Sequence, residues 1–214
     1  MIRVLLVDDH AVVRAGYRRF LEGGEQGSDP VSVVAEAANA EAGYSLFREH
    51  APDVSVVDLS LAGAGGFELI RRMIAHQPLA RALVFSMHDD AISATRALRA
   101  GARGYVTKHS APGILVDAVR QVHAGRSFLS PDIAQRLAIH SGGVDPLAAL
   151  SAKEFEVFRL IAEGRSIANI AAALSLSQKT VANYQALIKD KLGAGTTAAL
   201  VHLALRHGLI APPS

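Results

Sequence analysis

The sequence lacks cysteine and tryptophan altogether, and aromatic residues make up only 5% of its 214 residues. Without cysteine the chain cannot form disulfide bonds, thiolate metal sites or a thiol nucleophile, so it does not depend on an oxidising compartment. Long apolar runs are also absent. Residues 4–7 lead straight into Asp8 and Asp9, and no run approaches the roughly 20 residues of a membrane span. These absences predict a cytosolic, globular protein without a signal peptide.

An excess of charge of one sign is missing too. The net charge is only +2, and because residues 1–130 hold equal numbers of basic and acidic residues, the excess arises after residue 130. A protein that binds nucleic acid through charge alone would carry a clustered basic stripe. The charge balance therefore leaves DNA binding open. Half of the residues are hydrophobic, which is enough for a packed core in each of two small domains.

The first 125 residues alternate short apolar runs with amphipathic stretches. The runs are rich in Val, Leu and Ile, as in a parallel sheet that helices cover on both faces. Strands are predicted at residues 2–7, 31–37, 54–58, 82–86 and 104–107, and helices at residues 11–21, 39–50, 67–76, 91–100 and 112–124. These five strand–helix repeats predict a doubly wound, flavodoxin-like (βα)5 domain over residues 1–125, which would bind ligands beyond the carboxyl ends of its strands.

The pattern changes after residue 125. Residues 126–146 are predicted to be a linker with a short helix at 132–139, since Ser141-Gly142-Gly143 and Asp145-Pro146 favour a flexible connection. Residues 147–214 show only helical periodicity and predict a small all-α, four-helix domain.

Helix boundaries in this second domain are marked by capping residues. Ser151 and Glu154 match a capping box that opens the first helix, and Ser166 and Ser177 are placed to cap the second and third. A fourth helix is predicted at about residues 196–207. The short connection between the second and third helices is the layout of a helix-turn-helix.

Three carboxylates stand at strand ends in the first half. Asp8 and Asp9 follow the first predicted strand and Asp58 ends the third, and these strands are neighbours in a doubly wound sheet. Converging carboxylates repel one another unless a cation lies among them, and a hard divalent ion such as Mg²⁺ is the natural occupant. Asp58 would then be placed to attack a phosphoryl group, with Lys108 and Ser86, at the ends of the fifth and fourth strands, beside its oxygens.

Each of these residues alone has a simpler explanation, because an aspartate at a strand end is more often a helix cap or a turn residue. Polar residues at the ends of four different strands favour a site instead. His88, Asp89 and Asp90 follow Ser86, and we interpret them as a turn and a helix start rather than a second metal site.

The segments around these residues resemble the receiver domains of response regulators, over residues 1 to about 125. The matching segments are VLLVDDH (4–10), VDL (57–59), VFS (84–86) and GYVTK (104–108). The resemblance implies that Asp58 is the phospho-acceptor, that Asp8, Asp9 and Asp58 hold Mg²⁺, and that Lys108 and Ser86 contact the phosphoryl group.

Two further positions bear on this resemblance. Tyr105 matches the aromatic switch residue of receivers, although a core aromatic would explain it equally well. After the acceptor, receivers commonly carry Met-Pro-Gly, whereas this chain has Leu61-Ala62-Gly63. The loop therefore lacks the fixed φ of proline.

The second half resembles the LuxR-type DNA-binding domain over about residues 147–209. The segments that carry this resemblance are LSAKEFEV (150–157), IAAAL (170–174), SQKTV (177–181) and KLG (191–193). A receiver followed by such a domain is the architecture of the NarL/FixJ class of regulators.

The third helix of this domain has two faces. Val181, Tyr184, Ile188 and Leu192 recur at helical spacing and are predicted to face the core. The opposite face is predicted to enter the DNA major groove, with Lys179, Thr180, Lys189 and Lys191 on phosphates and Asn183 on a base. Gln185 is as well explained as a surface residue. Relatives often carry cations after Thr-Val, but this chain has Ala182 and Asn183, so we expect fewer phosphate contacts and a shallower salt dependence than in those relatives.

These features together predict a transcription regulator that is switched by phosphorylation. A partner sensor histidine kinase would phosphorylate Asp58, and the DNA-binding domain would then be freed or form a homodimer on double-stranded promoter DNA. Three alternatives stay open: a DNA-binding protein that ignores phosphorylation, a helical bundle with no DNA role, and a phosphohydrolase that uses the acidic rim. The last would need a general acid and a substrate pocket that the sequence does not show, so no enzyme is predicted.

Overall fold

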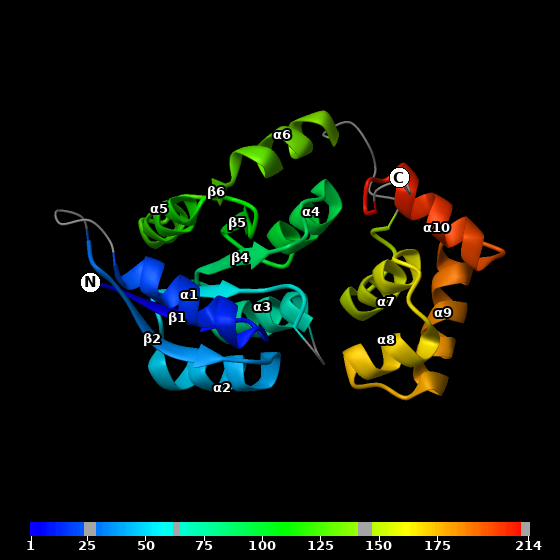
Figure 1. Ribbon diagram of the computed structural model, residues 1–214, viewed down its shortest axis with the longest axis horizontal. Coiled ribbons are helices and arrows are strands. Elements are labelled where there is room, and N and C mark those ends of the chain that lie inside the picture. Colours follow the sequence, from blue (N-terminus) through cyan, green and yellow to red (C-terminus); the bar gives the residue numbers. More distant parts are fainter. Residues whose placement is uncertain (24–28, 62–64, 141–146, 211–214) are drawn as a thin grey trace.

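The computed structural model describes residues 1–23, 29–61, 65–140 and 147–210, and its first half alternates strands and helices (Figure 1). The strands are β1 (Ile2–Val7), β2 (Val31–Ala37), β3 (Val54–Val57), β4 (Ala82–Ser86), β5 (Gly104–Thr107) and β6 (Phe128–Leu129). The helices of this half are α1 (Ala11–Glu22), α2 (Ala40–His50), α3 (Gly65–His76), α4 (Ala91–Arg99), α5 (Pro112–His123) and α6 (Pro131–His140). Ala62, Gly63 and the predicted linker residues 141–146 lie outside the described residues.

The strands form one parallel sheet in the order β2-β1-β3-β4-β5-β6. One buried cluster joins the sheet to α1 and α5, and another joins it to α2, α3 and α4. Helices therefore cover both faces, which explains why the strands are almost continuously apolar. The predicted doubly wound fold is confirmed, with one addition. Strand β6 lies beside β5 and was not foreseen, because a strand of two residues leaves no hydrophobic run to detect.

Helix α6 follows β6 directly and packs against α4 and β5. The Ile133 side chain is fully buried there. The Thr107 hydroxyl donates a 2.9 Å hydrogen bond to Asp132 Oδ2, and the amide of Ser130 donates one to the carbonyl of Tyr105. Residues 128–140 are therefore attached to the end of β5 by strand pairing, side-chain burial and hydrogen bonds together.

The second half consists of helices α7 (Ala152–Ala162), α8 (Ile167–Leu174), α9 (Gln178–Lys191) and α10 (Thr197–Arg206). The predicted capping box is present, since Ser151 Oγ accepts from the amide of Glu154 and the Glu154 carboxylate accepts from the amide of Ser151. Ser166 and Ser177 cap α8 and α9 as expected. The four-helix domain with its helix-turn-helix is thus confirmed. Within the described part of the chain, no helix is long and apolar enough to cross a membrane.

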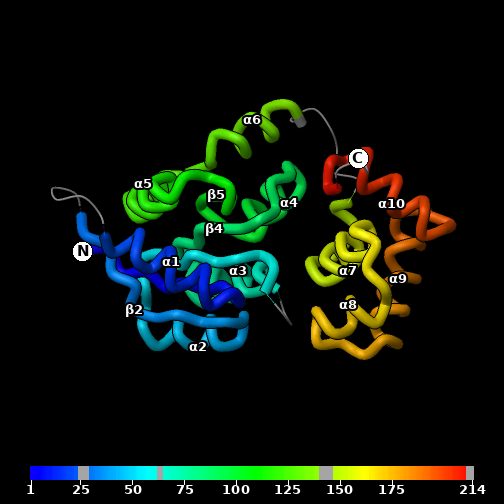
Figure 2. The backbone as a smooth tube through the Cα atoms, in the orientation of Figure 1, coloured from blue at the N-terminus to red at the C-terminus, as the bar shows by residue number. Residues whose placement is uncertain are grey.

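The two domains meet through α7, which packs against α3 and lies between the sheet domain and α9 (Figures 1 and 2). Arg96 of α4 makes a polar contact between the domains. Its guanidinium donates hydrogen bonds of 2.9 Å to the carbonyl of Leu147 and 2.6 Å to the carbonyl of Leu150. The same group lies 4.2 Å from the centre of the Phe155 ring. One arginine therefore binds both the backbone and an aromatic ring of the second domain.

Apolar and steric contacts complete this interface. The Phe155 ring meets Phe67 of α3 edge to face, with ring centres 6.1 Å apart. Gly65 begins α3 with a φ of +72°, and a Cβ added there would lie 2.9 Å from a carboxylate oxygen of Glu156. Gly65 is therefore required for its left-handed backbone, and a side chain there would also displace the carboxylate of Glu156.

We expect Arg96→Ala to loosen the contact between the domains. The change removes two hydrogen bonds from a charged donor and the contact with Phe155, and it should weaken docking by about 2 kcal/mol. Small-angle scattering would then show a larger radius of gyration than in the unaltered chain.

Arg71→Ala is the matched control for this experiment. Arg71 and Arg96 line the same pocket between the domains, but Arg71 is exposed and pairs with Glu68 within α3. It should change docking by less than about 0.5 kcal/mol. Equal effects of the two substitutions would contradict the role given to Arg96.

Candidate functional site

Two buried aspartates lie side by side at the carboxyl ends of β1 and β3. Asp8 directly follows β1 and Asp58 directly follows β3, and these strands are hydrogen-bonded neighbours. The amide of Asp58 donates a hydrogen bond to the carbonyl of Val7. The side chains of Asp8 and Asp58 are buried, since these residues are only 1% and 2% exposed. Two carboxylates in this position require positive charge nearby, because an unpaired buried charge is strongly destabilising.

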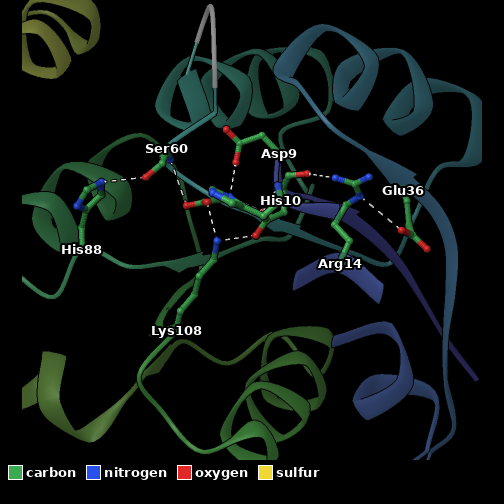
Figure 3. A network of polar contacts seen from close by, with 9 residues as sticks. Asp9, His10, Arg14, Glu36, Ser60, His88 and Lys108 are labelled. Carbon is green, nitrogen blue, oxygen red and sulfur yellow. Dashed lines mark hydrogen bonds and ion pairs between the residues drawn. The ribbon is translucent and has the colours of Figure 1, made fainter. Parts of the chain in front are cut away.

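Lys108 supplies that charge. It follows β5, and its Nζ lies 2.5 Å from Asp8 Oδ2 and 2.7 Å from Asp58 Oδ2 (Figure 3). Burial alone would lower the pKa of Lys108, but the two carboxylates outweigh it and hold the pKa above its usual value. The predicted meeting of Asp8, Asp58 and Lys108 is seen directly.

The outer part of the rim is formed by Asp9 and His10. His10 Nδ1 lies 2.7 Å from Asp9 Oδ1 and 3.4 Å from Asp8 Oδ1. One ligand atom from each of Asp8, Asp9, His10 and Asp58 falls within 4.8 Å of the others. Three carboxylates at this spacing form an acidic pocket of the kind that holds Mg²⁺. His10 was missed by the reasoning from strand ends, although it directly follows the Asp-Asp pair.

A second set of contacts joins Asp58 to the loop after β4. Asp58 Oδ1 accepts from the amide of Ser60 at 3.1 Å, and Ser60 Oγ lies 3.1 Å from His88 Nε2. Burial, with the positive charges of Arg159 and Lys108, lowers the pKa of His88 to about 3, so His88 is neutral. Arg159 belongs to α7, and the second domain therefore acts electrostatically on a residue beside the acidic pocket.

Ser86 and Tyr105 both form hydrogen bonds to the backbone of His88, in the loop after β4. Ser86 is fully buried, and its hydroxyl accepts a 3.4 Å hydrogen bond from the amide of His88. The Tyr105 ring is fully buried, and its hydroxyl donates to the carbonyl of His88 at 2.8 Å. Tyr105 is thus a core aromatic that also holds the loop. Asp90 caps α4 through the amide of Ser93, as expected for a helix start.

Arg14 of α1 connects the pocket to β2, which the sequence did not indicate. Its guanidinium donates a 2.5 Å hydrogen bond to the carbonyl of Asp8, and its Nε lies 3.5 Å from a carboxylate oxygen of Glu36 (Figure 3). In the loop after β4, Asp89 pairs with Arg136 of α6 at 2.7 Å. The loops around Asp58 are therefore attached to α1 and to α6.

In the second domain, α9 buries one face and exposes the other. Val181 and Ile188 are buried, and Tyr184 and Leu192 pack against the same core, as predicted. Exposed residues occupy the opposite face of the helix: Lys179, Ala182, Asn183, Ala186, Leu187 and Asp190. Helix α9 packs on α7 and α8, and its outward face is exposed to solvent within the described part of the chain.

The side chains that were expected at DNA differ in their surroundings. Lys179 and Asn183 are exposed and Lys189 is half-buried. The Thr180 hydroxyl lies 2.8 Å from Ser177 Oγ, within the cap of α9. Lys191 donates a 2.7 Å hydrogen bond to Glu154 of α7. Gln185 donates to the Thr197 hydroxyl at 3.0 Å, which agrees with its interpretation as a surface residue of the fold.

Both halves of the chain match families of known proteins. Residues 4–120 match the response regulator receiver domain, and residues 148–204 match the luxR family of bacterial regulatory proteins. The chain is 36% identical over 213 residues to the response regulator UvrY of Escherichia coli strain K12, covering 98% of this chain and 96% of that one. It is 37% identical over 214 residues to the response regulator GacA of Pseudomonas aeruginosa, covering 98% of each.

A solved structure shares the same two-domain organisation. RcsB from Salmonella enterica serovar Typhimurium, bound to the promoter rprA in the presence of the phosphomimetic BeF3-, aligns with a TM-score of 0.65 and 29% identity, over 94% of this chain and 96% of that one. The families matched here are transcription regulators rather than enzymes. The chain belongs to the two-component response regulators that join a receiver domain to a LuxR-type helix-turn-helix domain.

Proposed function

We propose that this protein is a transcription regulator whose binding to promoter DNA is controlled by phosphorylation of Asp58. The observation that carries the proposal is the contact of Lys108 with the two buried carboxylates of Asp8 and Asp58. A phosphoryl group on Asp58 would meet a positive charge already positioned for its oxygens. The site lies in a receiver domain, whose partners are sensor histidine kinases, and we place the protein in the cytoplasm, where it would meet its DNA.

The transfer follows from the geometry of the pocket. A carboxylate oxygen of Asp58 attacks the phosphorus of the kinase's phosphohistidine, the P–N bond breaks and its electron pair stays on the imidazole. Lys108 moves from the carboxylates toward the new phosphoryl oxygens, and Ser86 donates a hydrogen bond to them. Asp8, Asp9 and Asp58 would hold Mg²⁺, which supplies further positive charge to these oxygens.

The loop after β4 would transmit the conformational change from Asp58 to the second domain. A shift of Ser86 disturbs the hydrogen bonds that Ser86 and Tyr105 make to His88. His88 lies within the electrostatic reach of Arg159 in α7, and Asp89 pairs with Arg136 in α6. Phosphorylation therefore biases two features at once, the docking of α7 and the attachment of the linker helix. We take the docked and undocked arrangements as the two states.

DNA binding is assigned to α9 and its flanks. The outward face of α9 is already exposed while α7 is docked, so the switch acts on how two chains pair rather than on uncovering this helix. A homodimer would present two α9 helices to half-sites about one helical turn apart. Lys179, Thr180, Lys189 and Lys191 are proposed at phosphates and Asn183 at a base. RcsB, a relative, has been solved as dimers bound to DNA.

We expect Asp58→Ala to abolish the switch. The test is selection from a randomised DNA pool with Mg²⁺ and beryllium fluoride, a phosphoryl mimic, followed by affinity measurement with and without the mimic. The unaltered chain should enrich a two-fold-symmetric site that it binds at least tenfold more tightly with the mimic, since allosteric coupling is typically about 1–3 kcal/mol. Asp58→Ala should give one affinity in both conditions.

Asp117→Ala serves as the control, because Asp117 is an exposed aspartate on α5. It should keep both the site and the response to the mimic. An unaltered chain whose affinity ignores the mimic would leave a DNA-binding protein without phosphorylation control.

Thr107→Val tests the route through the linker. The change keeps the shape of a fully buried side chain but removes its hydrogen bond to Asp132. Phosphoryl incorporation should stay normal, while the gain in DNA affinity should fall about fivefold, the equivalent of one hydrogen bond of about 1 kcal/mol.

Ser110→Ala is the matched control, because the Ser110 hydroxyl lies 3.0 Å from Thr107 Oγ1, whereas the hydrogen bond to Asp132 comes from Thr107 itself. A gain in DNA affinity that survives Thr107→Val intact would show that α6 does not carry the switch.

A further inference from the structure

The outward face of α9 has an unusual composition for a helix expected to lie on DNA. Of its six exposed residues, three are apolar (Ala182, Ala186 and Leu187) and one is an amide (Asn183). Leu187 is 49% exposed, in a chain that buries most of its large hydrophobic side chains. The two remaining members, Lys179 and Asp190, stand at opposite ends of the face and carry opposite charges.

Three polar side chains at the edges of this face also contact other parts of the domain, which directs them away from the middle of the face and toward the flanking phosphates. The amide of Gln185 donates to Thr197, and Lys191 pairs with Glu154. The Thr180 hydroxyl is shared with Ser177 in the helix cap. Asn183 is therefore the polar group at the middle of the face that is presented outward, between the methyl groups of Ala182 and Ala186.

Base pairs differ in what they present to such a face. Guanine shows two acceptors in the major groove, which arginine or lysine binds in a bidentate manner, and the middle of this face carries neither residue. Adenine shows an acceptor beside a donor, which an asparagine amide matches. Thymine shows a 5-methyl group, which packs favourably against apolar side chains. The chemistry of the face is thus complementary to A·T pairs.

We infer that α9 selects A·T base pairs at the centre of each half-site, with Asn183 on an adenine and the methyl groups of Ala182 and Ala186 against thymine 5-methyl groups. The inference rests on the proposed DNA-binding function and specifies its sequence preference. Asp190 limits how the helix enters the groove, because its carboxylate is repelled by phosphates. The N-terminal half, which carries Lys179, therefore lies deeper. This half contains Ala182 and Asn183, and Ala186 lies at the start of the other half.

The test uses the full chain with Mg²⁺ and beryllium fluoride and the DNA site selected from the random pool. Each thymine of the half-site is replaced in turn by deoxyuridine, which removes only the methyl group. Each central adenine is replaced by 7-deazaadenine, which removes the N7 acceptor. The unaltered chain should lose about three- to fivefold in affinity at one or two thymines, as burial of one methyl group predicts, and about tenfold at one adenine.

Protein variants then assign each loss to a residue. Ala182→Ser and Ala186→Ser should each bind the thymine and deoxyuridine versions of one position equally. Asn183→Ala should no longer distinguish adenine from 7-deazaadenine. Ala198→Ser is the matched control, because Ala198 is an exposed alanine on α10 rather than on α9, and it should show every loss seen with the unaltered chain. The base replacements on the unaltered chain do not depend on whether a variant folds.

The outcomes distinguish the inferred preference for A·T pairs from the proposed DNA binding itself. A selected site with G·C pairs at the centre of each half-site, or equal tolerance of thymine and deoxyuridine throughout, would overturn the inference and leave DNA binding intact. If no sequence is enriched in any condition, the proposed DNA-binding function fails, and the inference fails with it. Losses that disappear only in the matching variants would establish the contacts.

Discussion

The ammonium group of Lys108 is the charge on which the rest of the site depends. Asp8 and Asp58 come from neighbouring strands and are almost completely buried, an arrangement that would cost several kcal/mol for each unpaired carboxylate. Lys108 reaches them from β5, across the end of β4. Its contacts therefore join the ends of three strands that are distant in sequence. These ion pairs hold the starts of the loops that follow the three strands close together.

Any new charge at Asp58 must redistribute these contacts. The neighbouring loop is well placed to respond, because its conformation depends on hydrogen bonds to Ser86 and Tyr105 rather than on regular secondary structure. Its histidine, His88, is neutral and half-buried, and the charge of Arg159 in the other domain acts on it. Ionic and hydrogen-bonded contacts are sensitive to small displacements. A rearrangement at Asp58 can therefore reach α6 and α7 without large movements of the sheet.

Much of the fold and the pocket could be predicted from the sequence because the relevant patterns are local. Apolar runs marked the strands, and serines marked the starts of α7, α8 and α9. The carboxyl ends of parallel strands lie at one edge of the sheet, so Asp8, Asp58 and Lys108 could be predicted to lie close together, as they do in the structure. Helical spacing likewise separated the buried Val181 and Ile188 from the exposed Asn183.

The remaining features depend on contacts between distant segments. The binding of Arg96 to Leu147 and Leu150 spans 51 and 54 residues of sequence. No periodicity encodes this contact, nor that of Ser60 with His88. Lys191 resembled a phosphate contact in the sequence, and only the packing of α9 on α7 shows its ion pair with Glu154. The close approach of the Glu156 carboxylate to Gly65 likewise joins two segments that are distant in sequence.

Strand β6 has a consequence for the first domain on its own. It covers the outer side of β5, and α6 behind it buries Ile133 and Ser130. A chain shortened at residue 125 would leave β5 as an open edge strand, with unpaired backbone groups and an uncovered apolar patch. Such edges pair readily with strands of other molecules, so the shortened domain would be prone to aggregate. The segment after the last helix of the (βα)5 unit thus protects the solubility of the domain that precedes it.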